Sequence, residues 1–315
     1  MAGAGKEDIK TAIRAAWDSG QAILEVYQRD FSIEYKDDRS PLTEADKAAH
    51  EIICAGLKST GLPVLSEESK TVSYEQRKNW GRFWLVDPLD GTKEFIKKNG
   101  EFTVNIALID AGRPVLGVVY APVLKTFYIG VQGLGAFRAT GDEIFQCLKL
   151  TSASFFQALE KFEPIPLSSD LCPPSSAIRV VASRSHMNPE TETFIAALEK
   201  QGRVELVSSG SSLKLCMVAE GLADVYPRIA LTMEWDTAAA QAVVEASGGQ
   251  VVKYDPAISA VSYLPQSAKH IEHSEDNSAL HAPCPMLHAL SYNKENLLNP
   301  FFVVSGMDYR IKENG

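Results

Sequence analysis

The sequence predicts an α/β fold in two parts, helices with an antiparallel sheet first and then strands that alternate with helices. The first part has apolar residues at helical spacing, followed by short apolar segments separated by turn residues. The second part has strand-like and helix-like segments in turn, which is the pattern of βα units. We place the boundary near residue 150, between an N-terminal α+β subdomain (1–150) and a C-terminal α/β subdomain (151–315).

The composition is that of a globular protein with an acidic chain. The 315 residues are 45% hydrophobic and 23% charged, with a net charge of −9 and a pI of about 5.3. An acidic chain is a poor match for nucleic acid, whose binding depends on basic surface, but a bound metal ion can attract a small anion. The five cysteines form no CxxC pair, so neither a disulfide framework nor a zinc cluster is indicated.

The N-terminal residues are charged, and no run of about 18 apolar residues occurs. We therefore expect a soluble cytoplasmic protein without a stable membrane span, and we leave peripheral membrane association open. The sequence does not decide between a monomer and a homodimer.

The first elements are a helix, a strand and a second helix. Residues 6–29 have the apolar spacing of an amphipathic helix, and residues 31–36 alternate as a strand does. Thr43 is the expected N-cap of a helix that runs to about residue 59, and Asp46 stands at the third helical position, as in a capping box. On these local grounds capping alone explains Asp46.

Two predicted strands then end in acidic residues twenty positions apart, at Glu67 and Asp87. We expect the apolar strand 83–86 to stop at Asp87, where a proline follows and the chain must turn. Strands that end at one edge of a sheet would bring Glu67, Asp87 and Asp90 together, and hard cations prefer such oxygen ligands. Gly91 and the amides of a following short helix would suit a phosphate.

The middle of the chain is expected to form further strands and then a connector. Residues 102–139 contain three strand-like segments separated by turns, which indicates an antiparallel meander. Residues 153–176 contain four prolines, so we expect an irregular connector between the two halves.

In the second half, predicted strands lead into polar turns that suit an anion. Three of them end near candidate binding groups: 178–182 before Ser183, Arg184 and His186, 204–207 before Ser211 and Lys214, and 223–228 at Arg228. Asp236 is expected at the start of a further helix. On local grounds, helix capping explains an aspartate there as well as a role in the site does. Residues 257–285 are rich in Ser, Asn, Pro and His and predict an exposed loop, and 297–304 predict a last strand.

Three motifs in this order resemble the inositol monophosphatase superfamily: Glu67-Glu68, Asp87-Pro88-Leu89-Asp90-Gly91-Thr92 and Trp235-Asp236. Shorter stretches resemble the CysQ-type 3′(2′),5′-bisphosphate nucleotidases within it, among them Lys93-Glu94-Phe95, Gly210-Ser211-Ser212-Leu213-Lys214, Tyr226-Pro227-Arg228 and the run from Asn293 to Pro300. The resemblance implies a five-layer α/β/α/β/α sandwich of the inositol monophosphatase and fructose-1,6-bisphosphatase type.

The resemblance also implies a metal site and a water-activating pair. Mg²⁺, two or three ions, would be held by Glu67, Asp87, the carbonyl of Leu89, Asp90 and Asp236. Thr92 and Asp46 would activate water together, since a threonine alone is a poor base. The substrate would be bound by these residues and by polar groups of the second half: Glu67, Leu89, Asp90, Gly91, Thr92, Ser183, Arg184, His186, Ser211, Lys214, Arg228 and Asp236.

The implied activity is hydrolysis of the 3′-phosphate of adenosine 3′,5′-bisphosphate to AMP and phosphate, with 3′-phosphoadenylyl sulfate as a further substrate. Sulfur metabolism and sensitivity to lithium belong to the same expectation. The partner is a small phosphorylated nucleotide and not a nucleic acid. Two alternatives stay open: an inositol monophosphate or fructose bisphosphate phosphatase with the same metal ligands, and a non-catalytic Mg²⁺-dependent sensor of a phosphorylated metabolite.

Overall fold

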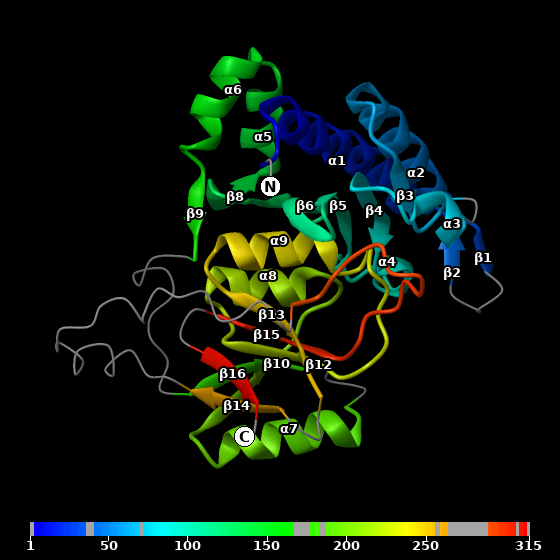
Figure 1. Ribbon diagram of the computed structural model, residues 1–315. Helices are drawn as coiled ribbons and strands as arrows, with labels where there is room; N and C mark the ends of the chain where they lie inside the picture. The colour runs from blue at the N-terminus through cyan, green and yellow to red at the C-terminus, as the bar shows by residue number, and fades with distance from the viewer. Residues whose placement is uncertain are drawn as a thin grey trace, which may run out of the picture.

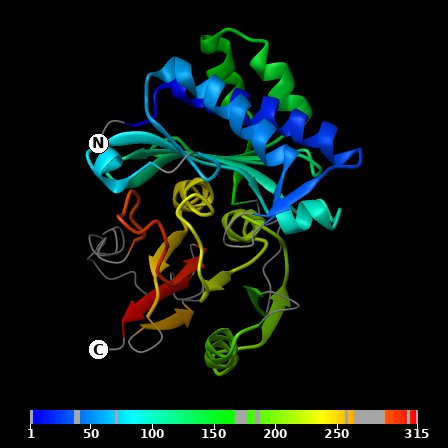
Figure 2. The same ribbon diagram turned by 90° about the vertical axis from the view of Figure 1, so that its right-hand side faces the viewer.

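The computed structural model describes residues 3–35, 41–69, 72–166, 177–182, 187–255, 259–263, 289–306 and 309–313. These residues form five stacked layers, which are helices, a sheet, helices, a second sheet and a last helix (Figures 1 and 2). The five-layer sandwich that the resemblance implies is confirmed. None of the helices in the described ranges is both long and apolar enough to cross a membrane.

The first two layers are a group of helices and a seven-stranded sheet. The helices cover one face of the sheet and share a core with it; they are α1 (Lys6–Tyr27), α2 (Glu44–Leu57), α5 (Gly141–Leu148) and α6 (Ser152–Leu159). The strands follow the order of the chain: β3 (Val64–Ser66), β4 (Arg82–Asp90), β5 (Thr103–Asp110), β6 (Arg113–Ala121), β7 (Thr126–Val131), β8 (Gly135–Thr140) and β9 (Glu163–Ile165). β3 and β4 are parallel, and the other neighbours are antiparallel.

The third layer consists of α8 (Leu213–Glu220) and α9 (Ala238–Ala246), which lie between the two sheets (Figure 2). α9 packs with its backbone directly on β6 and β7. A Cβ atom at Gly117 would stand 2.0 Å from the carbonyl oxygen of Ala239, and one at Gly130 would stand 2.4 Å from Cα of Val243. This close approach fixes the turn that precedes α9 against the first sheet.

The second sheet has the order β11 (Val204–Val207), β10 (Ile178–Val181), β12 (Val225–Arg228), β15 (Phe302–Ser305) and β13 (Gln250–Lys253). α7 (Pro189–Glu199) packs on its outer face and begins at Asn188, whose side chain caps the helix as its position before Pro189 suggests. The remaining elements are short: β1 (Ile33–Tyr35), β2 (Pro41–Thr43), η1 (Lys58–Thr60), α3 (Tyr74–Arg77), α4 (Thr92–Ile96), β14 (Ser259–Tyr263) and β16 (Tyr309–Glu313).

Two expectations about element boundaries are wrong. β4 does not stop at Asp87; it continues to Asp90, with an irregular register between these residues that accommodates Pro88, which has no N–H to donate. Residues 153–165 are not irregular, because α6 and β9 occupy most of them. β9 is an edge strand, where Pro164 is tolerated because one side of the strand has no neighbour to which an N–H would donate.

Two other expectations are not settled, and most of residues 257–285 lies outside the described residues. Within 257–285 the structure describes 259–263, which form β14 and pair with β16 instead of forming a loop. The boundary near residue 150 stays a prediction; α6 and β9, which follow it, pack with the first sheet.

Candidate active site

Acidic side chains converge where β3 and β4 end. Because the two strands are parallel and Ser66 pairs with Val86, Glu67 follows β3 at the level where Asp87 stands in β4. Burial raises the pKa of Asp87 well above its usual range, and the nearby charges of Glu67, Asp90 and Asp236 raise it further. Asp236 comes from the turn before α9, so the two halves of the chain meet at this acidic site.

The donor set of the acidic site suits a hard divalent cation. It offers carboxylate oxygen atoms, and the charges of neighbouring carboxylates raise the pKa of Asp87 and of Asp236 beyond the effect of burial, a repulsion that a cation would relieve. As they stand, no three or more His, Cys, Asp or Glu side chains in the described part of the chain are arranged closely enough to hold a metal ion. The assignment of Glu67, Asp87, Asp90 and Asp236 as ligands therefore stays a prediction.

The acidic site should make the metal-free protein less stable as the pH rises. Burial and the charge of Asp90 raise the pKa of Asp236 to about 7, from 3.8. The folded protein thus keeps a proton that the unfolded chain releases, so stability falls between about pH 4 and pH 7. With EDTA present, we expect a melting temperature several degrees lower at about pH 7.5 than at about pH 5.

Asp236→Asn is the control, because it removes this titration and should lessen the pH dependence, while the raised pKa of Asp87 contributes the remainder. Adding Mg²⁺ should raise the melting temperature of the unmodified protein most at the higher pH, where the carboxylates are charged. A melting temperature in EDTA that rises from about pH 5 to about pH 7.5 would contradict the raised pKa of Asp236.

Asp46 uses its two carboxylate oxygens for different purposes. Oδ2 accepts hydrogen bonds from the backbone N–H (2.7 Å) and the hydroxyl (2.6 Å) of Thr43, which closes the predicted capping box of α2. Oδ1 lies 3.3 Å from the hydroxyl of Thr92 at the start of α4. The side chain is buried, and this burial raises the pKa of Asp46. Capping and contact with Thr92 therefore coexist in one carboxylate.

Ser212 and Asn105 connect the acidic residues, and the sequence analysis gave neither a role. The buried hydroxyl of Ser212 lies 2.7 Å from Oδ2 of Asp90 and 2.9 Å from the carbonyl oxygen of Asp236. Asn105 Nδ2 donates to Ser212 Oγ at 2.8 Å. A signal existed for Asn105, which is an amide inside an otherwise apolar strand and pairs with Asp87 across β4 and β5.

The turn that starts α4 is built around Gly91. Its φ of +93° is in the left-handed region, and a Cβ atom there would stand 2.0 Å from Oγ of Ser211. The Ser211 hydroxyl reaches the backbone carbonyls of Asp90 (2.9 Å) and Glu101 (2.8 Å). Ser211 thus lies against the backbone of the Gly91 turn, while its predicted role in substrate binding stays a prediction.

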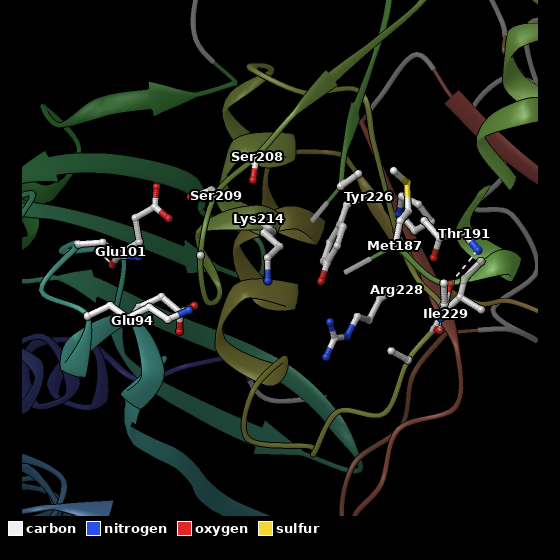
Figure 3. Close-up of a pocket in the computed structure, with 17 residues that line it drawn as sticks. Glu94, Glu101, Met187, Thr191, Ser208, Ser209, Lys214, Tyr226, Arg228 and Ile229 are labelled. Carbon is white, nitrogen blue, oxygen red and sulfur yellow. Dashed lines mark hydrogen bonds between the residues drawn. The ribbon is translucent and has the colours of Figure 1, made fainter. Parts of the chain in front are cut away.

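A pocket of about 400 Å³ lies beside the acidic site, between α4 and β12 (Figure 3). Glu94 and Glu101 line one side, and Lys214, Tyr226 and Arg228 line the other. The positive charge of Arg228 lowers the pKa of Asp236 against the larger upward shifts, which places the guanidinium close to the acidic site. The charge of Arg228 in the pocket therefore acts on a carboxylate of the acidic site.

The structure places the predicted binding residues unevenly. Lys214 and Arg228 line the pocket, and their role in substrate binding stays a prediction; Ser183, Arg184 and His186 lie outside the described residues. Tyr226 also lines the pocket; the sequence analysis quoted it within a motif but did not predict a role in binding for it. Its ring centroid lies 5.8 Å from Lys214 Nζ, which gives the pocket an aromatic surface beside a cation.

Comparisons with known proteins show which family the chain resembles. The model of the inositol monophosphatase family matches residues 5–284. The chain is 45% identical over 247 residues to the 3′(2′),5′-bisphosphate nucleotidase CysQ of Salmonella typhimurium, covering 77% of this chain and 89% of the relative. The CysQ of Escherichia coli K12 is 45% identical over 240 residues, covering 75% and 86%.

Solved structures give the same result. The crystal structure of CysQ from Bacteroides thetaiotaomicron, a bacterial member of the inositol monophosphatase family, superposes with a TM-score of 0.74 at 45% identity, covering 96% of this chain and 98% of that chain. An inositol monophosphatase from Zymomonas mobilis, at 22% identity and a TM-score of 0.62, shares the fold; it covers 95% of this chain and 92% of its own.

Proposed function

The chain belongs to the inositol monophosphatase family, and from this premise we propose that it is a 3′(2′),5′-bisphosphate nucleotidase. Its reaction is hydrolysis of the 3′-phosphate of adenosine 3′,5′-bisphosphate to AMP and phosphate, with 3′-phosphoadenylyl sulfate as a second substrate. The observation that carries this proposal is the pocket beside the acidic site. It offers Tyr226 as an aromatic surface for a base, and Lys214 and Arg228 as cations for a second phosphate.

The acidic residues supply the ligands of the proposed cofactor. Mg²⁺, two or three ions, would be held by the carboxylates of Glu67, Asp87, Asp90 and Asp236 and by the carbonyl of Leu89. When bound, such ions offset the negative charge of the phosphate in the transition state and make water more acidic. The hydroxyl of Ser212 donates to Oδ2 of Asp90 at 2.7 Å and so orients this carboxylate.

The protein's own groups handle the proton. The hydroxyl of Thr92 orients the attacking water and donates toward Oδ1 of Asp46, and the raised pKa of Asp46 makes its carboxylate a better base than an exposed one. Water then bonds to phosphorus and gives one proton to Asp46, while the bond from phosphorus to the 3′-oxygen breaks. The 3′-oxygen takes up a proton from solvent water to give the hydroxyl of AMP, and Asp46 returns its proton to solvent. The backbone of Gly91 and Thr92 at the start of α4 is the proposed cradle for the scissile phosphate.

Phosphate release separates this function from its two alternatives. We expect adenosine 3′,5′-bisphosphate to be hydrolysed with a much higher kcat/KM than inositol 1-phosphate or fructose 1,6-bisphosphate, with Mg²⁺ present in each assay. Preference for a sugar or inositol phosphate would overturn the nucleotide assignment and leave the metal site intact. Binding of the nucleotide without phosphate release would instead indicate a sensor.

Arg228→Ala should raise KM for the bisphosphate nucleotide by roughly 10- to 100-fold, because a charge-assisted hydrogen bond to phosphate contributes about 1.5–3 kcal/mol. A small monophosphate that does not reach the pocket should keep its KM within about 2-fold. Arg29→Ala is the matched control, since that arginine makes an exposed ion pair with Glu44 away from the pocket. Equal increases for both substrates would remove Arg228 from the specificity pocket.

A further inference from the structure

The segment of residues 292–299, which we name the C-terminal clamp, lies against α3 and against the turn that carries Asp236. Figure 1 shows this orange-red stretch beside the end of the first sheet, far along the chain from α3. Backbone hydrogen bonds tie it to the turn: the N–H of Glu234 donates to the carbonyl of Leu297 at 2.9 Å, and that of Asn299 donates to Thr232 at 2.8 Å. The contacts proposed above for the substrate and for the cofactor do not involve this segment.

The C-terminal clamp holds the side chain of Glu234, which lies two residues before Asp236. Its side chain is fully buried, and it accepts hydrogen bonds from the backbone N–H of Asn293 (2.7 Å), the backbone N–H of Lys294 (3.0 Å) and Nζ of Lys294 (2.6 Å). A buried carboxylate is tolerated only when it is paired in this way. The position of Glu234 is therefore set by the conformation of residues 293 and 294.

Asn299 holds the other side of the same turn. Its buried amide Nδ2 donates to the carbonyl of Met233 at 2.8 Å and to the hydroxyl of Thr237 at 2.9 Å. The N–H of Met233 in turn donates to Oδ2 of Asp236 at 2.9 Å. The contacts of Glu234 and Asn299 thus flank Asp236 and fix the peptide group that orients its carboxylate.

The C-terminal clamp also reaches the N-terminal half. Arg77, at the end of α3, is 2% exposed and donates to Oδ1 of Asn293 (2.8 Å) and to the carbonyls of Lys294 (2.7 Å) and Glu295 (2.9 Å). Nδ2 of Asn293 returns a hydrogen bond to the carbonyl of Arg77 at 2.8 Å. One short segment therefore connects the Asp236 turn with the helix that follows Glu67 in the chain.

We propose that the C-terminal clamp is a positioning device for the metal site, which acts through Glu234 and Asn299 to hold the Asp236 carboxylate facing Asp90 and Glu67. This proposal rests on the proposed role of Asp236 as a metal ligand. Its residues touch neither the substrate nor the ion. Weakening the clamp should therefore loosen cation binding while leaving the nucleotide pocket, which Lys214, Tyr226 and Arg228 form, unchanged.

The test is direct cation binding by two clamp variants, Lys294→Met and Asn299→Leu. Calorimetric titration with Mn²⁺ should show affinity weakened by about 10- to 100-fold, the usual cost of losing a partner that orients a ligand. The Mg²⁺ concentration for half-maximal phosphate release should rise by the same factor. At saturating Mg²⁺, KM for adenosine 3′,5′-bisphosphate should stay within about 2-fold of the unmodified protein.

Two further variants separate positioning from general instability. Glu220→Gln alters a buried carboxylate of the same kind on α8, which contacts Arg138 and Tyr128, and it should lower the melting temperature without changing Mn²⁺ affinity. If Lys294→Met alone does not fold, the double variant Glu234→Gln/Lys294→Met removes both charges together and tests the same loss.

Each outcome of these measurements either supports or overturns the clamp proposal. Unchanged Mn²⁺ affinity in folded clamp variants overturns the proposal, and so does an equal loss of affinity in Glu220→Gln. If the unmodified protein binds no divalent cation, the metal assignment under the proposed function fails, and the clamp proposal fails with it. If the protein binds the cation and only the clamp variants lose affinity, the positioning role is supported.

Discussion

Asp90→Asn should abolish turnover and, with EDTA present, should make the protein more stable. The carboxylate of Asp90 raises the pKa of both Asp87 and Asp236, so it contributes repulsion to the metal-free site. The asparagine keeps an oxygen for the hydroxyl of Ser212, which lies 2.7 Å from Oδ2 of Asp90, but carries no charge. Activity and stability should therefore change in opposite directions.

The loss of activity should exceed the roughly 100-fold that removing an outer partner of a metal ligand costs, because a charged ligand itself is removed. The measurement is phosphate release over a titration of Mg²⁺, together with melting temperatures in EDTA and in Mg²⁺. The unmodified protein should gain more from Mg²⁺ than the variant does. Near-normal activity of Asp90→Asn at saturating Mg²⁺ would contradict its assignment as a ligand.

Asp18→Asn is a matched control for this variant. Asp18 lies on α1, where burial also raises the pKa of the carboxyl, but its charged neighbour is Arg14 and not another carboxylate. The substitution should leave turnover and the response to Mg²⁺ unchanged. A comparable loss in Asp18→Asn would show that any change in a partly buried carboxylate disturbs the enzyme.

Features set by neighbours in the chain could be predicted from the sequence. The capping box of Thr43 and Asp46 depends on residues three positions apart, and so does the Asn188 cap of α7. The meeting of Glu67 and Asp87 depends on one further assumption, that β3 and β4 lie side by side and run parallel, and their pairing confirms this although β4 continues to Asp90. Local patterns are sufficient where few contacts decide the outcome.

Features set by distant contacts could not be predicted in this way. β4 extends to Asp90 because β5 continues beside it, and the edge strand β9 exists because β8 offers a partner. The role of Ser212 depends on Asp90 and Asp236, which lie far from it in the chain but on either side of its hydroxyl. The same holds for Glu234, whose partners follow it by about sixty residues.

Thr92→Val should reduce kcat by roughly 10²- to 10⁴-fold, the range that general acid–base catalysis contributes. The hydroxyl lies 3.3 Å from Oδ1 of Asp46, and valine keeps the shape of the side chain without a group to orient water. KM should change much less than kcat, since the pocket residues are untouched. Thr92→Ser is the matched control, because it retains the hydroxyl and should retain most of the activity.

Asp46→Asn should produce a loss of similar size for the same reason. Its amide oxygen can still accept the hydrogen bonds that Thr43 gives to Oδ2, so α2 should stay capped while the base is lost. Thr140→Ala is the control for capping, because it breaks the same kind of capping box at α5, away from the site. It should cost about 1 kcal/mol of stability and leave kcat unchanged.

The double variant Thr92→Val/Asp46→Asn decides whether the two groups act as one unit. If the hydroxyl works only by passing the proton of water to Asp46, removing either group removes the whole effect, and the double variant should be no slower than the slower single variant. Losses that multiply would mean that Thr92 and Asp46 contribute independently. Asp46 would then be left with the capping role that its position in the sequence already explains.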